Sequence, residues 1–266
     1  MHVIITGASS GLGEGMARDF ASAGWSLTLV ARREPELRAL AGAFKAKAFA
    51  GDTHVIAADL SDLERCAGVI DEAEAALGPA DVLVNNAGIQ YVEPTVGITP
   101  ERGELLMAVN LLSPLRMTWR VLPGMIERRS GTIVNIASMA AVTPTPGMCH
   151  YNASKAGLAA ASESLRVELK DTGVNVVTVY PGPVTSPMES VARESFTGSW
   201  ATRNVPTGTP DEMARLVREA IVKGKPRLFY PKVYGVTRYS RVMSQWFTDT
   251  FTPPLKGEGK DEDPGQ

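Results

Sequence analysis

Cysteine is scarce in this chain of 266 residues, which contains only Cys66 and Cys149. Two cysteines without regular spacing indicate reduced thiols rather than a disulfide framework or a zinc motif, so we expect no metal. No apolar run approaches the roughly eighteen residues that cross a bilayer. The residues from Met1 to Gly7 enter a strand-like run with no basic segment, which predicts a cytoplasmic protein.

An excess of charge of either sign is also missing, because 27 basic and 29 acidic residues leave a net charge of −2. This balance gives no general attraction to nucleic acid or to an anionic membrane. Apolar residues make up 44% of the chain, which is ample for one continuous core. Without repeats or linkers, we expect one domain over residues 1–255, followed by a disordered tail over 256–266 that has no apolar residue.

Short apolar runs alternate with amphipathic helical patterns along most of the chain. Runs that are apolar throughout are typical of parallel strands buried on both faces, and the alternation predicts a doubly wound, mostly parallel α/β sheet with helices on both faces. Residues 186–210, rich in Ser, Thr, Gly and Pro, predict a long functional loop. Strands are expected at 3–5, 26–31, 55–58, 82–84, 132–137, 174–179 and 227–230, and helices at 13–23, 32–50, 62–77, 100–129 (interrupted by Pro114 and Pro123), 150–172 and 211–223.

A glycine-rich turn stands between the first strand and the first helix. Glycines at 7, 11 and 13 let the backbone turn sharply and approach a pyrophosphate at the helix N-terminus. Because the strand precedes the turn and the helix follows it, we predict a dinucleotide site rather than a turn needed only for packing. Its residues are Thr6, Gly7, Ser9, Ser10, Gly11, Leu12 and Gly13.

The end of the second strand bears on the choice of nucleotide. Ala31 occupies the position at which an acidic residue usually binds the ribose, and Arg32 and Arg33 follow it. No carboxylate repels a 2′-phosphate there, and a guanidinium can bind one with two hydrogen bonds. NADP(H) is therefore predicted over NAD(H), with Arg32 favoured over Arg33. The alternative is that both arginines are simply solvated.

Further motifs give the chain a resemblance to the short-chain dehydrogenase/reductase family over about residues 3–230, which implies a Rossmann-like catalytic domain. TGASSGLG resembles the family's TGxxxGxG, and Asn85 to Gly88 match its NNAG motif. The resemblance implies that Asp59, Leu60, Asn86, Ala87, Gly88, Pro181, Gly182, Val184 and Ser186 bind the cofactor, and that Asn110, Ser138, Tyr151 and Lys155 form the catalytic tetrad, with Tyr151 and Lys155 also contacting the cofactor.

The chain departs from the family after Pro181-Gly182. Ser186 stands where the family commonly has threonine, and Thr185 comes one place earlier. Either hydroxyl could bind the nicotinamide carboxamide, so the residue that makes this contact is left open. The resemblance also implies that Asn110 holds a water molecule that links Lys155 to solvent.

The chemistry of the tetrad follows from residue types and spacing. Tyr151 and Lys155 are four residues apart and share one helical face, and a nearby ammonium is expected to lower the pKa of the phenol. Such a tyrosine exchanges a proton with a carbonyl or alcohol oxygen, which the Ser138 hydroxyl also contacts. Each residue has an ordinary structural explanation when taken singly, whereas their combination with the glycine turn favours catalysis. His150 is expected to pack or to line the pocket rim.

The substrate and the C-terminal segment are less well defined. Apolar residues at 90–97, 139–148 and 183–210, among them Met139, Met148, Met188, Phe196 and Trp200, suggest an apolar pocket. Residues 231–255 predict an aromatic and basic helical extension, which would dock on its own domain, cover a subunit or, least favoured, lie on a membrane.

The sequence therefore predicts an NADP(H)-dependent oxidoreductase that interconverts a carbonyl and a secondary alcohol on an apolar small molecule. Nucleic acid is not an expected partner, and a homodimer or homotetramer is expected from the family. Two alternatives stay open. One is a non-catalytic protein that senses NADP, and the other is a dehydratase or epimerase that uses the same tyrosine and lysine.

Overall fold

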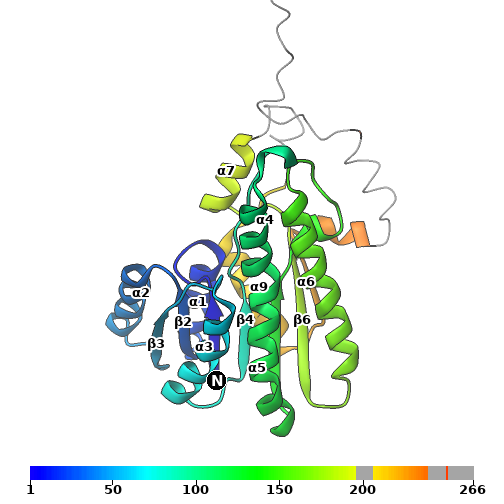
Figure 1. Ribbon diagram of the computed structural model, residues 1–266. Helices are drawn as coiled ribbons and strands as arrows, with labels where there is room; N and C mark the ends of the chain where they lie inside the picture. The colour runs from blue at the N-terminus through cyan, green and yellow to red at the C-terminus, as the bar shows by residue number, and fades with distance from the viewer. Residues whose placement is uncertain (196–205, 239–249, 251–266) are drawn as a thin grey trace, which may run out of the picture.

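Seven strands form a single parallel sheet in the order β3-β2-β1-β4-β5-β6-β7 (Figure 1). The computed structural model describes residues 1–195, 206–238 and 250. The expected doubly wound fold is confirmed, and each expected strand is present. The strands are β1 His2–Thr6, β2 Ser26–Ala31, β3 Thr53–Ala57, β4 Val82–Asn85, β5 Gly131–Ile136, β6 Val174–Pro181 and β7 Arg227–Tyr230.

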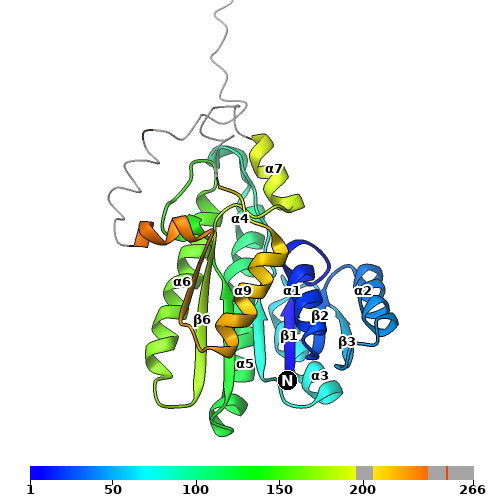
Figure 2. The same cartoon turned by 180° about the vertical axis from the view of Figure 1, so that it is seen from behind.

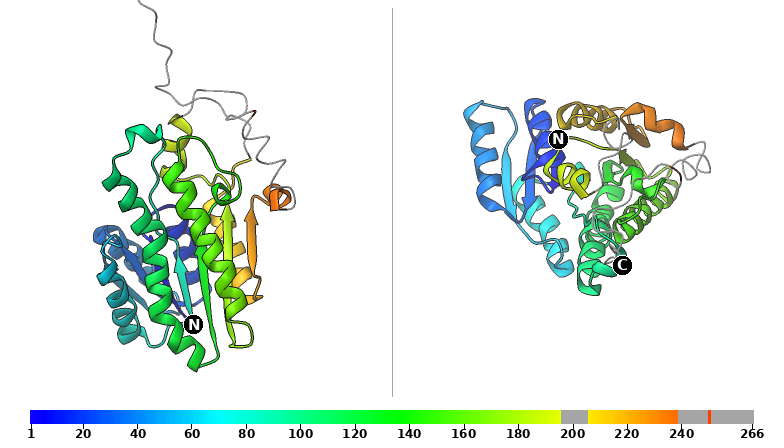
Figure 3. Two further views of the ribbon diagram at one scale, coloured as in Figure 1. Left: turned by 45° about the vertical axis from the view of Figure 1, so that its right-hand side comes forward. Right: turned by 90° about the horizontal axis from the view of Figure 1, so that it is seen from above.

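Helices cover both faces of the sheet, as the view along the strands shows (Figure 3). One apolar core joins the sheet to α1, α2 and α9, and a second joins it to α3 and α5. The α9 side faces the viewer in Figure 2. The helices are α1 Gly11–Ser22, α2 Glu34–Ala46, α3 Leu63–Leu77, α4 Pro100–Met107, α5 Ser113–Glu127, α6 Cys149–Glu168, α7 Pro187–Ser195 and α9 Pro210–Val222, with short helices η1 Thr95–Gly97, η2 Ala108–Leu112, η3 Met139–Ala141 and η4 Lys232–Arg238.

The first strand shows why the strands are apolar throughout. Val3 and Ile5 pack into the core on the α1 side, whereas Ile4 packs into the core on the α3 side. Successive side chains of a strand point to opposite faces, so a strand covered on both faces needs apolar residues at every position.

The topology determines where a ligand can reach the backbone. β1 lies between β2 and β4, so the chain extends the sheet in one direction to β3 and then in the other direction from β4 onward. Ligands of doubly wound sheets bind outside the carboxyl ends of the strands at such a switch point. The glycine turn after β1 and residues 86–88 after β4 both lie at this edge.

The helical stretch predicted for 100–129 is three segments. Thr99 caps α4 by accepting a hydrogen bond from the Arg102 N–H, a π-helical turn forms η2, and Pro114 lies in the first turn of α5. Pro123 lies inside α5 without ending it. The widened π-helical turn contains Asn110, whose side chain is buried. The sequence predicted interruptions of the helix at Pro114 and Pro123 and not at this turn.

The long loop predicted for 186–210 is partly wrong, because residues Pro187–Ser195 form α7. Arg193 binds Glu189 one turn earlier, an ion pair at helical spacing that the Ser and Pro content obscured. The helix predicted for 150–172 ends at Glu168. Asp171 and Gly173 have positive φ angles in the turn that leads to β6. Phe196, Trp200 and the tail 256–266 lie outside the described residues.

The described residues include the beginning of the predicted C-terminal extension. Residues Lys232–Arg238 form the 3-10 helix η4 rather than the start of an α-helix, and residues 239–249 lie outside the described part. In the described part of the chain, no helix has the length and apolar character that a membrane span requires. Over the same residues, no group of three or more metal-binding side chains comes together.

Candidate active site

The glycine turn holds its shape because three of its residues have no side chain. Gly7 and Gly11 have φ angles of 68° and 57°, which only glycine adopts readily. A Cβ on Gly13 would lie 2.2 Å from the Gly7 carbonyl oxygen, and one on Gly7 would lie 2.9 Å from the Ala87 Cα. The Ser10 side chain does not cap α1, which leaves the first-turn N–H groups for an anion. This cradle fits a nucleotide pyrophosphate.

Thr6 and Asn86 support the turn from beneath. The Thr6 hydroxyl donates to the Val84 carbonyl and accepts from the N–H groups of Asn86 and Ala87, both at 2.9 Å. The Asn86 side-chain amide in turn donates to the Thr6 carbonyl at 2.9 Å. Both residues were expected at the cofactor. Their side-chain hydrogen bonds connect the end of β1 to the end of β4 and thereby hold the first residues of the glycine turn in place.

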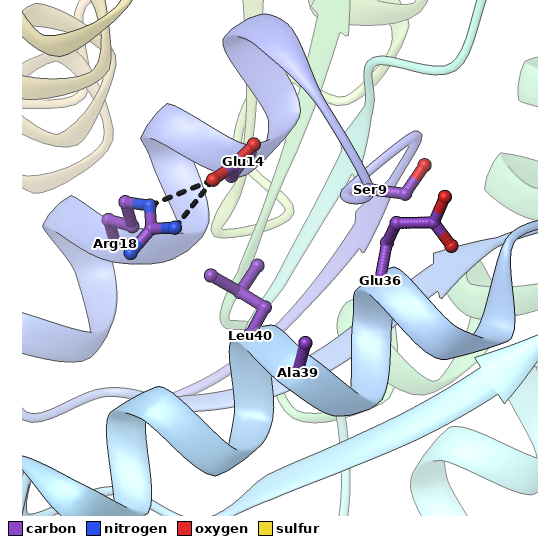
Figure 4. A pocket seen from close by; sticks show the side chains of 6 residues that line it. All are labelled: Ser9, Glu14, Arg18, Glu36, Ala39 and Leu40. Atoms are coloured by element: carbon purple, nitrogen blue, oxygen red, sulfur yellow. Dashed lines mark hydrogen bonds and ion pairs between the residues drawn. The ribbon is translucent and has the colours of Figure 1, made fainter.

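Arg33, rather than the favoured Arg32, contacts the glycine turn. Its Nη2 donates to the Ser9 hydroxyl at 3.0 Å and to the Ser9 carbonyl at 3.2 Å, and its Nη1 lies 3.5 Å from the Glu36 carboxylate. Figure 4 shows the adjacent hollow between α1 and α2, which Ser9 and Glu36 line at one end and Glu14 and Arg18 line at the other. The nearby Glu14 holds the Arg18 guanidinium.

Arg32 lies near Asp59, one of the predicted cofactor-binding residues. The Ser61 N–H and hydroxyl both donate to Asp59 at 2.9 Å, and together with the charge of Arg32 they lower the pKa of this carboxyl group. Leu60 is buried in the core on the α3 side. The Asp59-Leu60 pair therefore anchors the end of β3, with a charged carboxylate at the surface and an apolar side chain beneath.

Three of the four tetrad side chains meet at the carboxyl ends of β4 and β5. Tyr151 and Lys155 lie on the first two turns of α6, both more than nine-tenths buried. Ser138 follows β5, and its hydroxyl is hydrogen-bonded to the Tyr151 hydroxyl while accepting from the Ala140 N–H at 3.1 Å. The Lys155 ammonium donates to the Ile136 carbonyl at 2.8 Å and lies 5.9 Å from the centre of the Tyr151 ring.

The expected lowering of the Tyr151 pKa is wrong. Burial raises the pKa of the phenol, and the hydrogen bond to Ser138 offsets this only in part. The Lys155 ammonium is bonded to a backbone carbonyl instead of the phenol oxygen, and burial lowers its own pKa to about 8. At pH 7 the site therefore contains a neutral phenol and a charged ammonium.

Asn110 completes the tetrad from the π-turn η2. Its side chain is fully buried and makes two hydrogen bonds of 2.8 Å with the backbone of Ile89, one to the N–H and one to the carbonyl. A Cβ on Gly88 would lie 3.3 Å from the Asn110 Oδ1 and 3.4 Å from the Lys155 Nζ. Gly88 thus lies against both the amide and the ammonium, and even a methyl group there would touch both of them.

The two hydroxyls after Pro181-Gly182 have different surroundings. The Thr185 hydroxyl donates to the Gly208 carbonyl at 3.3 Å, beside an isolated bridge between Val184 and Gly208. Ser186 lies beside the glycine turn, since a Cβ on Gly11 would be 3.6 Å from the Ser186 Cβ. Ser186 also accepts from the Glu189 N–H and so begins α7. This placement favours Ser186 as the residue nearer the cofactor.

His150 and the methionines occupy the surroundings of Tyr151. The His150 ring packs against α4, where a Cβ on Gly103 would lie 2.5 Å from its Nε2, and this agrees with the packing expected for it. Met148 packs with Tyr151, and Met139 lies in a second apolar cluster with Tyr180. The apolar side chains of the first cluster therefore border Tyr151.

Comparison with known proteins agrees with this geometry. A family model described as short chain dehydrogenase matches residues 1–196. The chain belongs to this family. Its members include a short chain dehydrogenase from Pseudocercospora fijiensis, 40% identical over 69% of this chain and 59% of that protein. A very-long-chain 3-oxoacyl-CoA reductase from Anas platyrhynchos is 35% identical over 73% of this chain and 62% of that protein.

These matches span about three fifths of the length of the curated relatives. Among solved structures, a metagenomic short-chain oxidoreductase in complex with NADP aligns with a TM-score of 0.72 at 30% identity. That alignment covers 86% of this chain and 96% of the other. The fold and the family of this short-chain dehydrogenase are therefore established.

Two features of this short-chain dehydrogenase were not foreseen from its sequence. The Asn85 amide donates to the Asn135 side chain at 2.8 Å, and Asn135 donates to Ser162 at 2.8 Å, which links β4, β5 and α6 inside the core. The ring of Tyr234, from η4, lies on Gly182. The polar residues Asn85 and Asn135 in otherwise apolar strands could have indicated the hydrogen-bonded chain. No local sequence pattern indicates the contact between Tyr234 and Gly182.

Proposed function

We propose that the protein is an NADP(H)-dependent oxidoreductase that interconverts a carbonyl and a secondary alcohol on an apolar small molecule. The observation that carries this proposal is the convergence of Ser138, Tyr151 and Lys155. A buried phenol is hydrogen-bonded to a hydroxyl, and a buried ammonium lies 5.9 Å from its ring centre. Burying the charge of a lysine costs stability, and buried titratable groups with shifted pKa values gather at functional sites. This arrangement is therefore more typical of a catalytic site than of packing.

The residues that would hold NADP(H) follow from the glycine turn. The N–H groups of Gly11 to Gly13 would bind the pyrophosphate, Arg33 and Ser9 the 2′-phosphate, and Ser186 and Lys155 the nicotinamide end. Ala31 in place of a carboxylate and the NADP bound to the metagenomic relative support the preference for this nucleotide. When bound, the cofactor supplies or accepts the hydride.

The protein's own contribution is to hold the oxygen and move the proton. With its raised pKa, Tyr151 is protonated at pH 7 and can give its proton to a carbonyl oxygen. The Ser138 hydroxyl is within reach of the same oxygen, because it is bonded to the phenol. The charged Lys155 stabilises the phenolate that the transfer leaves. These protonation states favour the reduction of a carbonyl near neutral pH.

The substrate is proposed to be apolar, in the chemical class of ketones and acyl-derived carbonyls. Leu106, Ala140 and Met148 form a buried apolar cluster with Tyr151, and Ile89 and Tyr91 pack against it. The oxoacyl-CoA reductase among the relatives acts on a carbonyl of this kind. Since all seven described strands belong to one sheet, we propose that a single domain carries the activity.

A panel of aldehydes, ketones and 3-oxoacyl thioesters tests the proposal, with NADPH or NADH oxidation followed by absorbance. We expect turnover of at least one apolar carbonyl and a preference for NADPH. If NADPH binds tightly and no carbonyl or alcohol reacts, the NADP-sensing alternative replaces the proposal. Release of water or inversion of a sugar carbon without net NADPH oxidation would indicate the dehydratase or epimerase alternative.

A further inference from the structure

Tyr234 occupies the space in which Gly182 would carry a side chain. A Cβ built on Gly182 would lie 2.7 Å from the Tyr234 Cε2 and 2.9 Å from its Cδ2. No real Cβ tolerates contacts this short, so Gly182 has to be glycine while the ring is in place. The ring comes from η4, immediately after β7, which the β6–β7 pairing brings to the Pro181-Gly182 turn.

The same ring packs against an apolar cluster that includes the residue after Ser138. Tyr234 and Val142 lie against a buried cluster that contains Met139 and Tyr180. Met139 begins η3, and the Ser138 hydroxyl caps η3 by accepting from the Ala140 N–H. Tyr234 therefore lies between the Pro181-Gly182 turn and the apolar cluster to which Met139, the neighbour of Ser138, belongs.

The Tyr234 hydroxyl is also anchored. It donates to the Pro206 carbonyl at 3.3 Å, and burial raises the pKa of this phenol, so it remains a donor at neutral pH. The nearby charge of Arg193 opposes that shift without reversing it. The ring is therefore held at both ends, by the apolar cluster and by a backbone carbonyl.

We propose that Tyr234 is a positioning residue, which sets the spacing between the Pro181-Gly182 turn and Ser138. This inference rests on the proposed function, in which the first turn borders the nicotinamide and Ser138 holds the carbonyl oxygen. Hydride transfer requires the two reacting atoms to be in close alignment, and a misplacement of about 1 Å can cost about 100-fold in rate. Tyr234 lies outside residues 1–196, which the family model matches.

Three variants separate positioning from general packing. Tyr234→Ala removes the ring, Tyr234→Phe retains it, and Phe229→Ala is the matched control. Phe229 lies against the same cluster and stacks on Tyr180 with ring centres 4.6 Å apart, so its truncation loosens the cluster without removing the ring that contacts Gly182. We expect kcat to fall about 10- to 100-fold in Tyr234→Ala, with less than about threefold change in Tyr234→Phe and Phe229→Ala. The Kd for NADPH should change less than kcat.

A kcat for Tyr234→Ala within about twofold of the wild type would overturn the inference, as would equal losses in Tyr234→Ala and Phe229→Ala. Tyr234→Leu takes the place of Tyr234→Ala if the alanine variant does not fold, and the same decrease in kcat is expected.

A binding experiment tests the contact without turnover. Gly182→Ala should weaken NADPH binding by displacing the turn, and Gly182→Ala combined with Tyr234→Ala should recover a large part of that affinity because the ring is gone. No recovery would overturn the inference. If the double variant shows this recovery while the wild type binds NADPH and turns over no carbonyl, the proposed function fails and the contact stands.

Discussion

Replacing Lys155 by methionine should stabilise the nucleotide-free protein while abolishing its activity. The side chain is only 4% exposed, and its ammonium makes one hydrogen bond, to the Ile136 carbonyl. Burial lowers the pKa of Lys155 from 10.5 to about 8. The charged form is therefore unfavourable in the folded state.

The size of the effect follows from the pKa. Each unit of difference between the pKa of Lys155 in the unfolded and the folded state corresponds to about 1.4 kcal/mol. The charge of Lys155 therefore costs about 3 kcal/mol of stability at pH 7. Methionine has a similar length and no charge, but it leaves the Ile136 carbonyl without this donor, a loss of about 1 kcal/mol. The free energy of unfolding should therefore rise by about 2 kcal/mol at pH 7.

Urea unfolding of the wild type and Lys155→Met at several pH values measures this gain, with exposed Lys170→Met as the matched control. Between pH 8 and 10.5 the unfolded lysine keeps its proton and the folded one has lost it, so wild-type stability rises relative to the variant. The gain should disappear over that interval, whereas Lys170→Met should show no such dependence. A variant less stable than the wild type at pH 7, with a difference independent of pH, would refute the reasoning.

Two other predictions concern the nucleotide and acid stability. Arg33→Ala should weaken NADPH binding about tenfold without changing NADH binding, and more than Arg32→Ala does, as fluorescence titration can show. Equal effects on both nucleotides would contradict the contact between Arg33 and a 2′-phosphate. Burial lowers the pKa of His2 below 6.5, so the unfolded state takes up a proton first and the free energy of unfolding should fall as pH drops below about 6.5. His2→Gln should flatten this dependence in urea unfolding, and an unchanged slope would exclude His2 as its source.

Local patterns predicted the fold and the two motifs on which the site depends. The glycine turn connects two consecutive elements and the Tyr151–Lys155 pair lies in one helix, so residue type and spacing within a short segment indicate their geometry. Their surroundings were less predictable. The sequence favoured Arg32, whereas Arg33 contacts the glycine turn, because the position of each arginine depends on how the chain turns between β2 and α2.

Burial and long-range contacts account for the remaining differences. The expected effect of Lys155 on Tyr151 failed because burial raises the pKa of the phenol more than the Ser138 hydrogen bond lowers it. Gly182 and Tyr234 come together through the pairing of β6 with β7, which no short pattern encodes. Helix α7 was obscured by serine and proline, although Glu189 and Arg193 have helical spacing.

Turnover by Tyr151→Phe tests the central claim most directly. The substitution removes only the phenol oxygen and leaves the ring packed with Leu106 and Met148. With a carbonyl that the wild type reduces, we predict that kcat falls to background while the Kd for NADPH and the thermal midpoint stay close to those of the wild type. Turnover at the wild-type rate would contradict the assignment of Tyr151 as the proton donor.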